Sequence, residues 1–235
     1  MTLRRRIERL ENLQKKICRE KASPKVDAWV QEAIRDPFLW ATRHTKTRNE
    51  HWLEEARSSP YECFPETAHL AALFAAFDHE RIIWIEKSRD LMLSWACVAY
   101  LTLQAMKVPA RGVIFQTQKA DKVIQLVDYA KCLWEQQDER LRKAFPLFKP
   151  MNIQSSTSLR FLNGSYILGI PGGADQLRSY HPWGYLNDEA SFQPEAGESY
   201  HEALSVVPGN IIFNSSAGPG WYADVRRGIV RNEEQ

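Results

Sequence analysis

RIIWIEKSRDLMLSW, at residues 81–95, is the stretch that decides the fold expected of this chain. Residues 81–85 form an apolar, β-branched run of strand length, and residues 91–100 favour a helix because they contain no glycine or proline. A polar turn that includes Lys87 connects the two segments. Such a strand–turn–helix directs backbone N–H groups and the positive end of the helix dipole to one point, which suits a phosphate group.

The turn departs from the usual phosphate-binding loop, G-x-x-x-x-G-K-[ST]. With Ser94 aligned to the last position, Lys87 and Met92 fall on the two glycines and Leu93 falls on the lysine. Two interpretations stay open: a phosphate site in which Ser94 adds a hydroxyl ligand for Mg²⁺, or a plain strand–turn–helix with an exposed Lys-Ser-Arg corner. Without glycine, residues 87–92 must be wide, partly collapsed or strained at one position.

Composition narrows the class of protein. The chain has 235 residues, 44% hydrophobic and 26% charged, which fits one large domain or a domain with an appendage. A net charge of +2 does not mark a dedicated nucleic-acid binder, so any contact with DNA must be local. The cysteines lack a C-x-x-C pair, which favours a reducing compartment and argues against a zinc site. The sequence shows neither a signal peptide nor an apolar run long enough for a membrane span, so we expect a cytoplasmic protein without membrane contact.

The chain divides by pattern at about residue 60. Residues 1–60 are predicted to form an N-terminal helical arm and an extended segment, and residues 61–235 the main domain. Residues 3–21 carry a narrow apolar stripe among basic side chains, so this helix is expected either to lie on the domain or to dock on a neighbouring subunit. A second helix is predicted at residues 26–34, ending before Asp36-Pro37.

Strands and helices alternate through the main domain. Helices are predicted at 67–77 and 119–134, further strands at 113–116, 183–186 and 211–213, and a hairpin at Asn163-Gly164, with residues 169–179 as a loop. The alternation predicts an α/β fold with a mainly parallel central sheet flanked by helices. Ligands of such sheets bind beyond the carboxyl ends of the strands, where the polar groups at 87–94, 188–189 and 214–216 all fall.

These strand ends hold the residue types that phosphoryl transfer to water requires. Lys87 is the candidate phosphate clamp, because its flexible side chain can reach the phosphates from the start of the loop. Ser94 and Asp188 are candidate Mg²⁺ ligands, and Glu189 is the candidate group that acts on the attacking water. An adjacent acidic pair is also common at a helix N-terminus, so Asp188-Glu189 alone has a second interpretation.

Arg178 precedes Asp188 by ten residues, in the segment that enters the strand. It is expected to reach a nucleotide held by the next subunit of a ring, where an arginine can contribute several orders of magnitude in rate. The alternative interpretation is a surface arginine paired with Asp175.

Three motifs, WIEKSRDLMLSW, YLNDEASF and FNSSAG, resemble the Walker A, Walker B and coupling motifs of phage terminase large subunits, the motors that package viral DNA. In that family the Walker A lysine is often moved to the front of the loop and the third position is arginine, which matches Lys87 and Arg89. The resemblance covers roughly residues 40–220. It implies a P-loop NTPase of the additional-strand, catalytic-glutamate (ASCE) class.

The resemblance also implies roles for individual residues. The residues expected to bind ATP are Lys87, Ser88, Arg89, Asp90 and Ser94, with Ser94 and Asp188 holding Mg²⁺. Glu189 would be the catalytic carboxylate and Arg178 the arginine finger. Asn214, Ser215 and Ser216 would couple hydrolysis to movement.

The implied function is ATP hydrolysis that drives double-stranded DNA into a capsid, in the host cytoplasm. The implied partners are a portal protein, a small terminase subunit and further copies of the chain in a ring. The family's RNase H-like nuclease domain should begin soon after the coupling motif, and the sequence ends at Gln235, so we expect no nuclease activity from it. Two alternatives stay open: a helicase-like, nucleic-acid-stimulated ATPase, and a non-hydrolysing assembly module that binds nucleotide or DNA.

Overall fold

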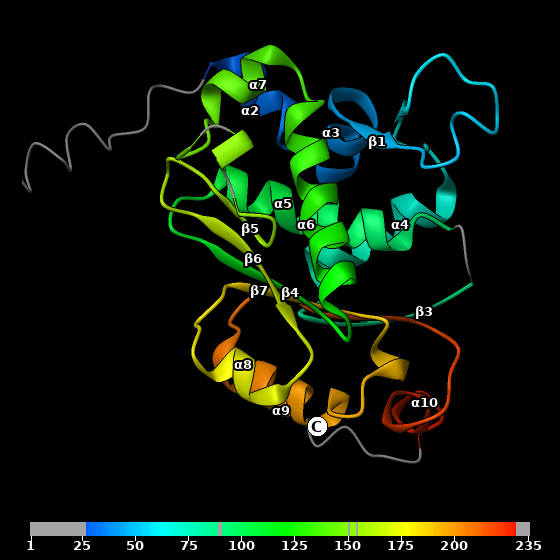
Figure 1. Ribbon diagram of the computed structural model, residues 1–235. Coiled ribbons are helices and arrows are strands. Elements are labelled where there is room, and N and C mark those ends of the chain that lie inside the picture. Colours follow the sequence, from blue (N-terminus) through cyan, green and yellow to red (C-terminus); the bar gives the residue numbers. More distant parts are fainter. Residues whose placement is uncertain (1–26, 89–90, 150, 154, 229–235) are drawn as a thin grey trace, which may run out of the picture.

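A six-stranded sheet with helices on both faces organises the computed structural model, which describes residues 27–88, 91–149, 151–153 and 155–228 (Figure 1). The strand order is β3-β8-β7-β4-β6-β5. The strands are β3 (Ile82–Lys87), β4 (Gly112–Thr117), β5 (Ser158–Arg160), β6 (Tyr166–Pro171), β7 (Gly184–Asp188) and β8 (Ile211–Ser216). Every neighbouring pair is parallel except β5 and β6. The predicted α/β class and mainly parallel sheet are therefore confirmed.

The antiparallel pair β5–β6 is the hairpin predicted at Asn163-Gly164. Gly164 has a φ of 87°, a left-handed conformation that glycine adopts without the steric cost of a side chain. Asn163 supports the turn, because its side-chain oxygen accepts from the Ser165 amide at 2.9 Å.

The helices form two layers, one on each face of the sheet (Figure 1). One layer contains the helices α2 (Ala28–Ala33), α3 (Pro37–His44), α4 (Ala68–His79), α5 (Leu93–Lys107), α6 (Ala120–Glu135) and α7 (Glu139–Ala144). The opposite layer contains α8 (Ala174–Arg178), α9 (Ala196–Val206) and α10 (Trp221–Arg226). Short 3₁₀ turns are η1 (Met151–Ile153) and η2 (Ala190–Phe192). Successive side chains of a strand point to opposite faces, so Val113 and Phe115 enter one core while Ile114 enters the other.

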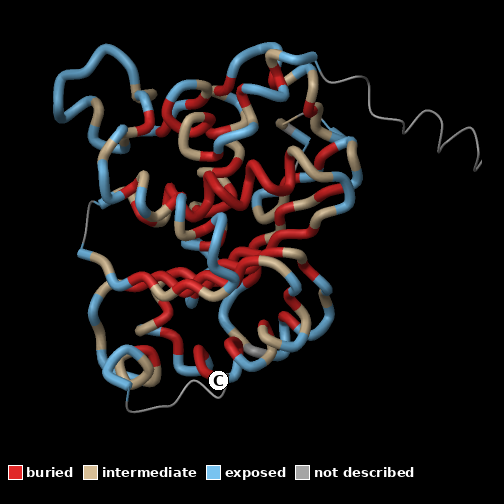
Figure 2. The backbone as a smooth tube through the Cα atoms, turned by 180° about the vertical axis from the view of Figure 1, so that it is seen from behind, coloured by how far each residue is buried: buried red, intermediate tan, exposed pale blue. Residues whose placement is uncertain are grey.

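Helix α5 runs through the interior of the helical layer that lies above the sheet in Figure 1 and in Figure 2. Its residues from Trp95 to Met106 are all buried, which follows from apolar side chains around the whole circumference of the helix. This burial fixes the start of α5, and with it Ser94, against the end of β3.

The early segment packs on the same core. Asp36 caps α3 by accepting from the amides of Phe38 and Leu39, with Pro37 at the first helical position. Trp40 is fully buried in the core cluster that includes α5. A two-stranded sheet pairs β1 (Lys46–Arg48) with β2 (Tyr61–Cys63) across the proposed division at residue 60. That division stays a prediction, and the helix predicted at 3–21 lies outside the described residues.

The expectation of a loop at 169–179 is wrong. Strand β6 extends to Pro171, and residues 174–178 form helix α8. Gly173, with a φ of 130°, permits the sharp entry into the helix, and Leu177 is buried in the core on that side of the sheet. Arg178 is therefore presented by a short helix.

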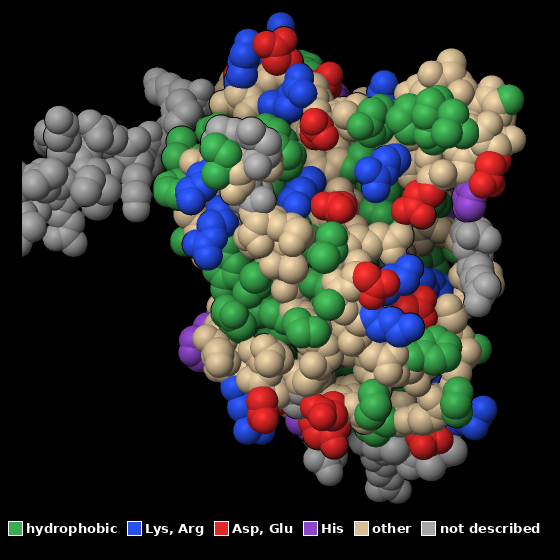
Figure 3. Space-filling view, in the orientation of Figure 1, with side chains coloured by type: hydrophobic (Ala, Val, Ile, Leu, Met, Phe, Trp, Pro, Cys, Tyr) green, Lys and Arg blue, Asp and Glu red, His purple; other side chains and the backbone are tan. Residues whose placement is uncertain are grey.

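Acidic and basic side chains are interspersed over the face shown in Figure 3, without one basic stripe. This surface agrees with the small net charge of +2. No helix in the described part of the chain is long and apolar enough to cross a membrane.

Candidate functional site

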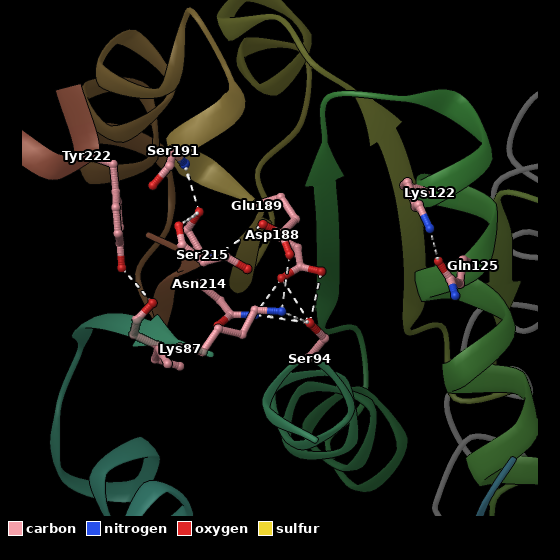
Figure 4. Close-up of polar contacts among 12 residues, drawn as sticks. Lys87, Ser94, Lys122, Gln125, Asp188, Glu189, Ser191, Asn214, Ser215 and Tyr222 are labelled. Carbon is pink, nitrogen blue, oxygen red and sulfur yellow. Dashed lines mark hydrogen bonds and ion pairs between the residues drawn. The ribbon is translucent and has the colours of Figure 1, made fainter. Parts of the chain in front are cut away.

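Four polar side chains from separate elements meet at the carboxyl ends of β3, β7 and β8 (Figure 4). Lys87 ends β3, Asp188 ends β7, Asn214 lies in β8 and Ser94 lies in the first turn of α5. Asn214 is paired in register with Asp188 on one side of β8 and with Ile85 on the other. Strand β8 thus separates the two strands whose motifs were predicted to cooperate, and it supplies a side chain between them.

The hydroxyl of Ser94 is the centre of this cluster. It accepts from Lys87 Nζ at 3.0 Å and from Asn214 Nδ2 at 3.1 Å, and it donates its proton to the Asp188 carboxylate, whose oxygens lie 3.0 and 3.1 Å away. A serine hydroxyl has one hydrogen and two lone pairs, so these contacts saturate it. Asn214 Nδ2 also donates directly to Asp188. The sequence predictions for Lys87, Ser94 and Asp188 therefore fall on one connected group of side chains.

Glu189 leaves the strand in a different direction. Its backbone is left-handed, with φ of 57° and ψ of 43°, which is uncommon for a residue with a side chain. Its carboxylate lies 3.3 Å from Lys87 Nζ and accepts from the Ser216 amide at 3.4 Å. The turn thus places the second carboxylate on the open side of the cluster, separate from the buried Asp188.

Burial controls the electrostatics of the site. Asp188 is 8% exposed, and desolvation raises the pKa of its carboxyl, opposed by the Lys87 ammonium and reinforced by the nearby charge of Glu189. The Lys87 side chain is 13% exposed and the Glu189 side chain 35%. The Lys87 ammonium is a nearby positive charge that offsets both carboxylates.

Asp188→Asn tests whether burial of the charged Asp188 carboxylate lowers the stability of the fold. The folded chain holds the Asp188 proton more tightly than the unfolded chain, where the pKa is about 3.9. The stability that this proton contributes is therefore fully present below the unfolded pKa and is lost as the pH rises through the folded pKa. We expect the wild type, without ligands, to lose unfolding free energy over that window and Asp188→Asn to lose less. Denaturant titrations from pH 4 to 8 measure this, and equal pH slopes for the two proteins would contradict the assignment.

The donor set fits Mg²⁺. Hydroxyl and carboxylate oxygens from Ser94 and Asp188 are hard ligands, and Mg²⁺ characteristically combines one or two carboxylates with substrate phosphates. Asn214 Oδ1 is fully buried beside them and has no hydrogen-bond partner, so a cation-bound water would satisfy it. Within the described ranges no group of three or more His, Cys, Asp or Glu could form an all-protein metal cage.

Among the described residues of the loop at 87–92, Met92 has a strained backbone. Met92 has a φ of 58° and a ψ of 16° at the N-cap of α5, without a side-chain cap. Met92 is the residue aligned with the second glycine of the usual loop, and glycine adopts this conformation without a steric penalty. Ser88 is exposed, whereas Arg89 and Asp90 lie outside the described residues. Their predicted nucleotide contacts stay predictions.

Met92→Gly and Met92→Ala separate this strain from the loss of the side chain. Both changes remove the same packing, but only glycine relieves the left-handed backbone. We expect Met92→Gly to be more stable than Met92→Ala by about 1 kcal/mol. The exposed position Ala75 inside α4 provides the control, because Ala75→Gly should lower stability by about 1 kcal/mol. Chemical denaturation checks both, and a lower stability for Met92→Gly than for Met92→Ala would contradict the strain.

Arg178 does not join the cluster around Ser94. Its side chain is 61% exposed, and its guanidinium donates to Glu202 on α9 at 2.6 Å and lies 3.2 Å from Asp175. The pairing with Asp175 is the alternative that the sequence left open. Exposure leaves the arginine accessible from outside the chain, so its role as a finger stays a prediction.

The segment expected to couple hydrolysis to movement contacts the turn after β7. Ser215 Oγ accepts from the Ser191 amide at 3.0 Å and donates to Ser216 O at 2.9 Å. With the Ser216 contact to Glu189, β8 reaches both carboxylates of the site. A movement of Glu189 would therefore act directly on this segment, although its coupling role stays a prediction.

Sequence reasoning missed two residues that hold the site together. Tyr222 on α10 donates to Ile85 O at 2.6 Å, which ties the C-terminal helix to the strand before Lys87. Gln193 donates to Asp188 O at 2.8 Å. Neither lies in a motif, and both contacts depend on how distant segments pack. No signal in the sequence singles them out.

The order of the strands defines the class of fold. The strand carrying Asn214 is inserted between the strand that leads to Lys87 and the strand that ends in Asp188. This is the additional-strand arrangement of ASCE P-loop NTPases, as the motifs implied.

Comparison with known proteins found similarity to solved structures but to no family model and no curated protein. The ATPase domain of the large terminase of Thermus phage P74-26 matches with a TM-score of 0.46 and 13% identity, over 76% of this chain and 73% of that chain. A mutant of that domain matches with a TM-score of 0.45 and 12% identity, over 76% and 74% of the two chains. The large terminase of a thermophilic bacteriophage matches with a TM-score of 0.47 and 11% identity, over 65% of this chain and 39% of that chain. These structural neighbours come from the family that the sequence motifs resemble.

Proposed function

We propose that this chain is the ATPase motor domain of a viral terminase large subunit, which hydrolyses ATP to move double-stranded DNA into a capsid. The observation that carries the proposal is the convergence of Lys87, Ser94, Asp188 and Glu189 at adjacent strand ends, with Asn214 between them. These side chains provide a phosphate clamp, metal ligands and a base in one place. Phosphoryl transfer to water needs each of them.

Lys87 and Ser94 act when the nucleotide binds, before the chemical step. The ammonium group now neutralises Glu189 and donates to Ser94, and both contacts are with groups that would face the nucleotide. When triphosphate binds, Lys87 turns to the phosphate oxygens, which carry more negative charge than a single carboxylate. Ser94 and Asp188 are then free to hold Mg²⁺, which supplies charge neutralisation on the phosphates when bound.

Glu189 acts on the attacking water. It lies at the open side of the cluster with a side chain about one-third exposed, so water can reach it while its charge stays close to the phosphates. Release of its ion pair with Lys87 makes the carboxylate available to orient the water and accept its proton. The clamp and the base are therefore engaged by the same event, the arrival of the nucleotide.

Arg178 acts between subunits in this proposal. Its support is the exposed position on α8, where its present partners, Glu202 and Asp175, belong to its own chain. In a ring it exchanges these partners for the nucleotide of a neighbouring copy. The ring works on a portal protein, receives DNA with the help of a small terminase subunit, and acts in the host cytoplasm.

Phosphate release from Mg·ATP, measured with and without double-stranded DNA, tests this function. We expect turnover that double-stranded DNA stimulates more than single-stranded DNA does. Glu198→Gln is a suitable matched control, because Glu198 is exposed on α9 and should leave turnover unchanged. Stimulation by single strands alone would support the helicase-like alternative. Calorimetry that shows no ATP binding would exclude both enzymatic functions.

A further inference from the structure

Four buried polar side chains form a continuous hydrogen-bonded chain beneath the site. Gln116, Tyr185 and Asn187 are fully buried, and Gln193 is 7% exposed. They come from β4, β7 and the segment after η2, and we call them the amide relay. Buried polar side chains are costly unless each finds a partner, so a fully connected set inside the sheet requires an explanation.

Each link of the amide relay is a direct hydrogen bond. Gln193 Nε2 donates to Asn187 Oδ1, and Asn187 Nδ2 donates to Tyr185 Oη at 3.0 Å. The tyrosine hydroxyl donates to Gln116 Oε1, and Gln116 Nε2 donates to Gly173 O at 2.9 Å and to Pro171 O at 3.3 Å. All the links therefore have the same donor-to-acceptor direction, which strengthens each bond by polarisation.

The two ends fix this direction. Gln193 Nε2 donates to Asp188 O at 2.8 Å, and a backbone carbonyl can only accept, so this amide group must present its nitrogen there. The same reasoning fixes Gln116, whose nitrogen faces two carbonyls. Both hydrogens of each terminal amide are used, which leaves no alternative orientation without an unsatisfied group.

The ends of the amide relay lie in the two segments that the proposed reaction uses. One end holds the carbonyl of Asp188, directly before the left-handed turn at Glu189. The other holds Gly173, the N-cap of the helix that presents Arg178. A displacement of either segment therefore breaks a link of the amide relay unless the other segment moves with it, because every link is a direct hydrogen bond.

We propose that the amide relay positions the Asp188–Glu189 turn and the Arg178 helix relative to each other, with Gln193 and Gln116 as positioning residues for hydrolysis. This inference rests on the proposed ATPase function. It goes beyond that function because it assigns a joint positioning role to Gln116 and Gln193, which lie outside the three motifs. When contact with a neighbouring subunit displaces the Arg178 helix, the amide relay moves the turn at Glu189 with it.

A double-mutant cycle with Gln116→Met and Gln193→Met tests the proposal. Each change keeps side-chain size and removes one end of the amide relay. We expect each to lower kcat by about 10- to 10²-fold with KM for ATP nearly unchanged, because the reacting groups are misplaced rather than removed. The double variant should be no worse than the more severe single variant, since one broken end already uncouples the segments. Reductions that multiply, or a KM that rises with the fall in kcat, would overturn the proposal.

Gln137→Met is the matched control. Gln137 is also a buried glutamine, but it contacts Met106 on α5 rather than the site. Its Oε1 is buried without a hydrogen-bond partner, so replacement of the amide should cost little stability and leave kcat unchanged. An equal loss of kcat in this variant would show that the Gln116 and Gln193 effects follow from the replacement of any buried glutamine.

Hydrogen exchange gives a readout that does not depend on turnover. In Gln193→Met we expect faster amide exchange at the far end, in residues 174–180, as well as in the adjacent turn. Faster exchange confined to residues 188–193 would overturn the proposal. If the wild type has no ATPase activity, the proposed function fails while this measurement still decides the coupling. If Gln116→Met does not fold, Tyr185→Phe, which removes the central hydroxyl, replaces it in both experiments.

Discussion

Glu189→Gln should abolish ATP turnover while the chain still binds Mg·ATP. The change keeps the shape of the side chain and its contact with the Ser216 amide, but it removes the negative charge that accepts a proton from the attacking water. A positioned general base contributes about 10²- to 10⁴-fold, so we expect a loss of that size in kcat. Single-turnover phosphate release, with ATP binding measured separately by calorimetry, checks both parts.

The geometry predicts that binding survives this change. Glu189 is now the ion-pair partner of Lys87, and its replacement removes a competitor for the ammonium group. The affinity for Mg·ATP should therefore stay equal or rise. A variant that retains most of its turnover would remove Glu189 from the reaction, and one that loses nucleotide binding would make it a structural residue.

Lys87→Met is expected to have the second large effect, on binding. The ammonium group makes charge-assisted contacts, each worth about 1.5–3 kcal/mol, so its loss should weaken ATP binding by roughly 10- to 10²-fold. Lys122→Met is the control, since Lys122 lies on α6 apart from the cluster and donates to Gln125 (Figure 4). Calorimetric titration with Mg·ATP measures both, and unchanged affinity in Lys87→Met would contradict the clamp.

Removal of the Lys87 ammonium group should also raise the affinity of the site for a free divalent cation. Lys87 Nζ lies 3.0 Å from Ser94 Oγ and pairs with Glu189, so it supplies the positive charge at the group that would hold Mg²⁺. We therefore expect Mn²⁺ alone, monitored by electron paramagnetic resonance, to bind Lys87→Met more tightly than the wild type. Equal Mn²⁺ affinities would show that Lys87 does not compete with the metal.

The sequence predicts the part of the fold that depends on local pattern. The segment at 81–95 forms a strand, a loop and a helix because its apolar runs and polar turn are contiguous, and the polar groups at 87, 94 and 188 meet because parallel strands end at one edge. Strain was one of the outcomes left open for a glycine-free loop, and Met92 has a left-handed backbone there. Each of these outcomes follows from neighbours in sequence or from the rule that ligands bind at strand ends.

Contacts between distant segments that do not follow from the common edge of the strand ends were not predictable. Helix α8 was missed because glycines on both sides of Pro171 indicated a loop, whereas the burial of Leu177 stabilises a helix there. The ion pair of Lys87 with Glu189 depends on the left-handed backbone of Glu189, which the residue types around it do not predict. The amide relay joins Gln116 on β4 to Gln193 through Tyr185 and Asn187 on β7, and no periodicity in the sequence indicates such a path.

A structure of the chain with Mg²⁺ and a non-hydrolysable ATP analogue would show whether the side chains around Ser94 form the nucleotide site. We expect Lys87 to leave Ser94 and Glu189 for the phosphates, the metal to contact Ser94 with Asp188 beside it, and Glu189 to face the terminal phosphate. A nucleotide bound elsewhere, with the contacts of Lys87 to Ser94 and Glu189 intact, would contradict this expectation.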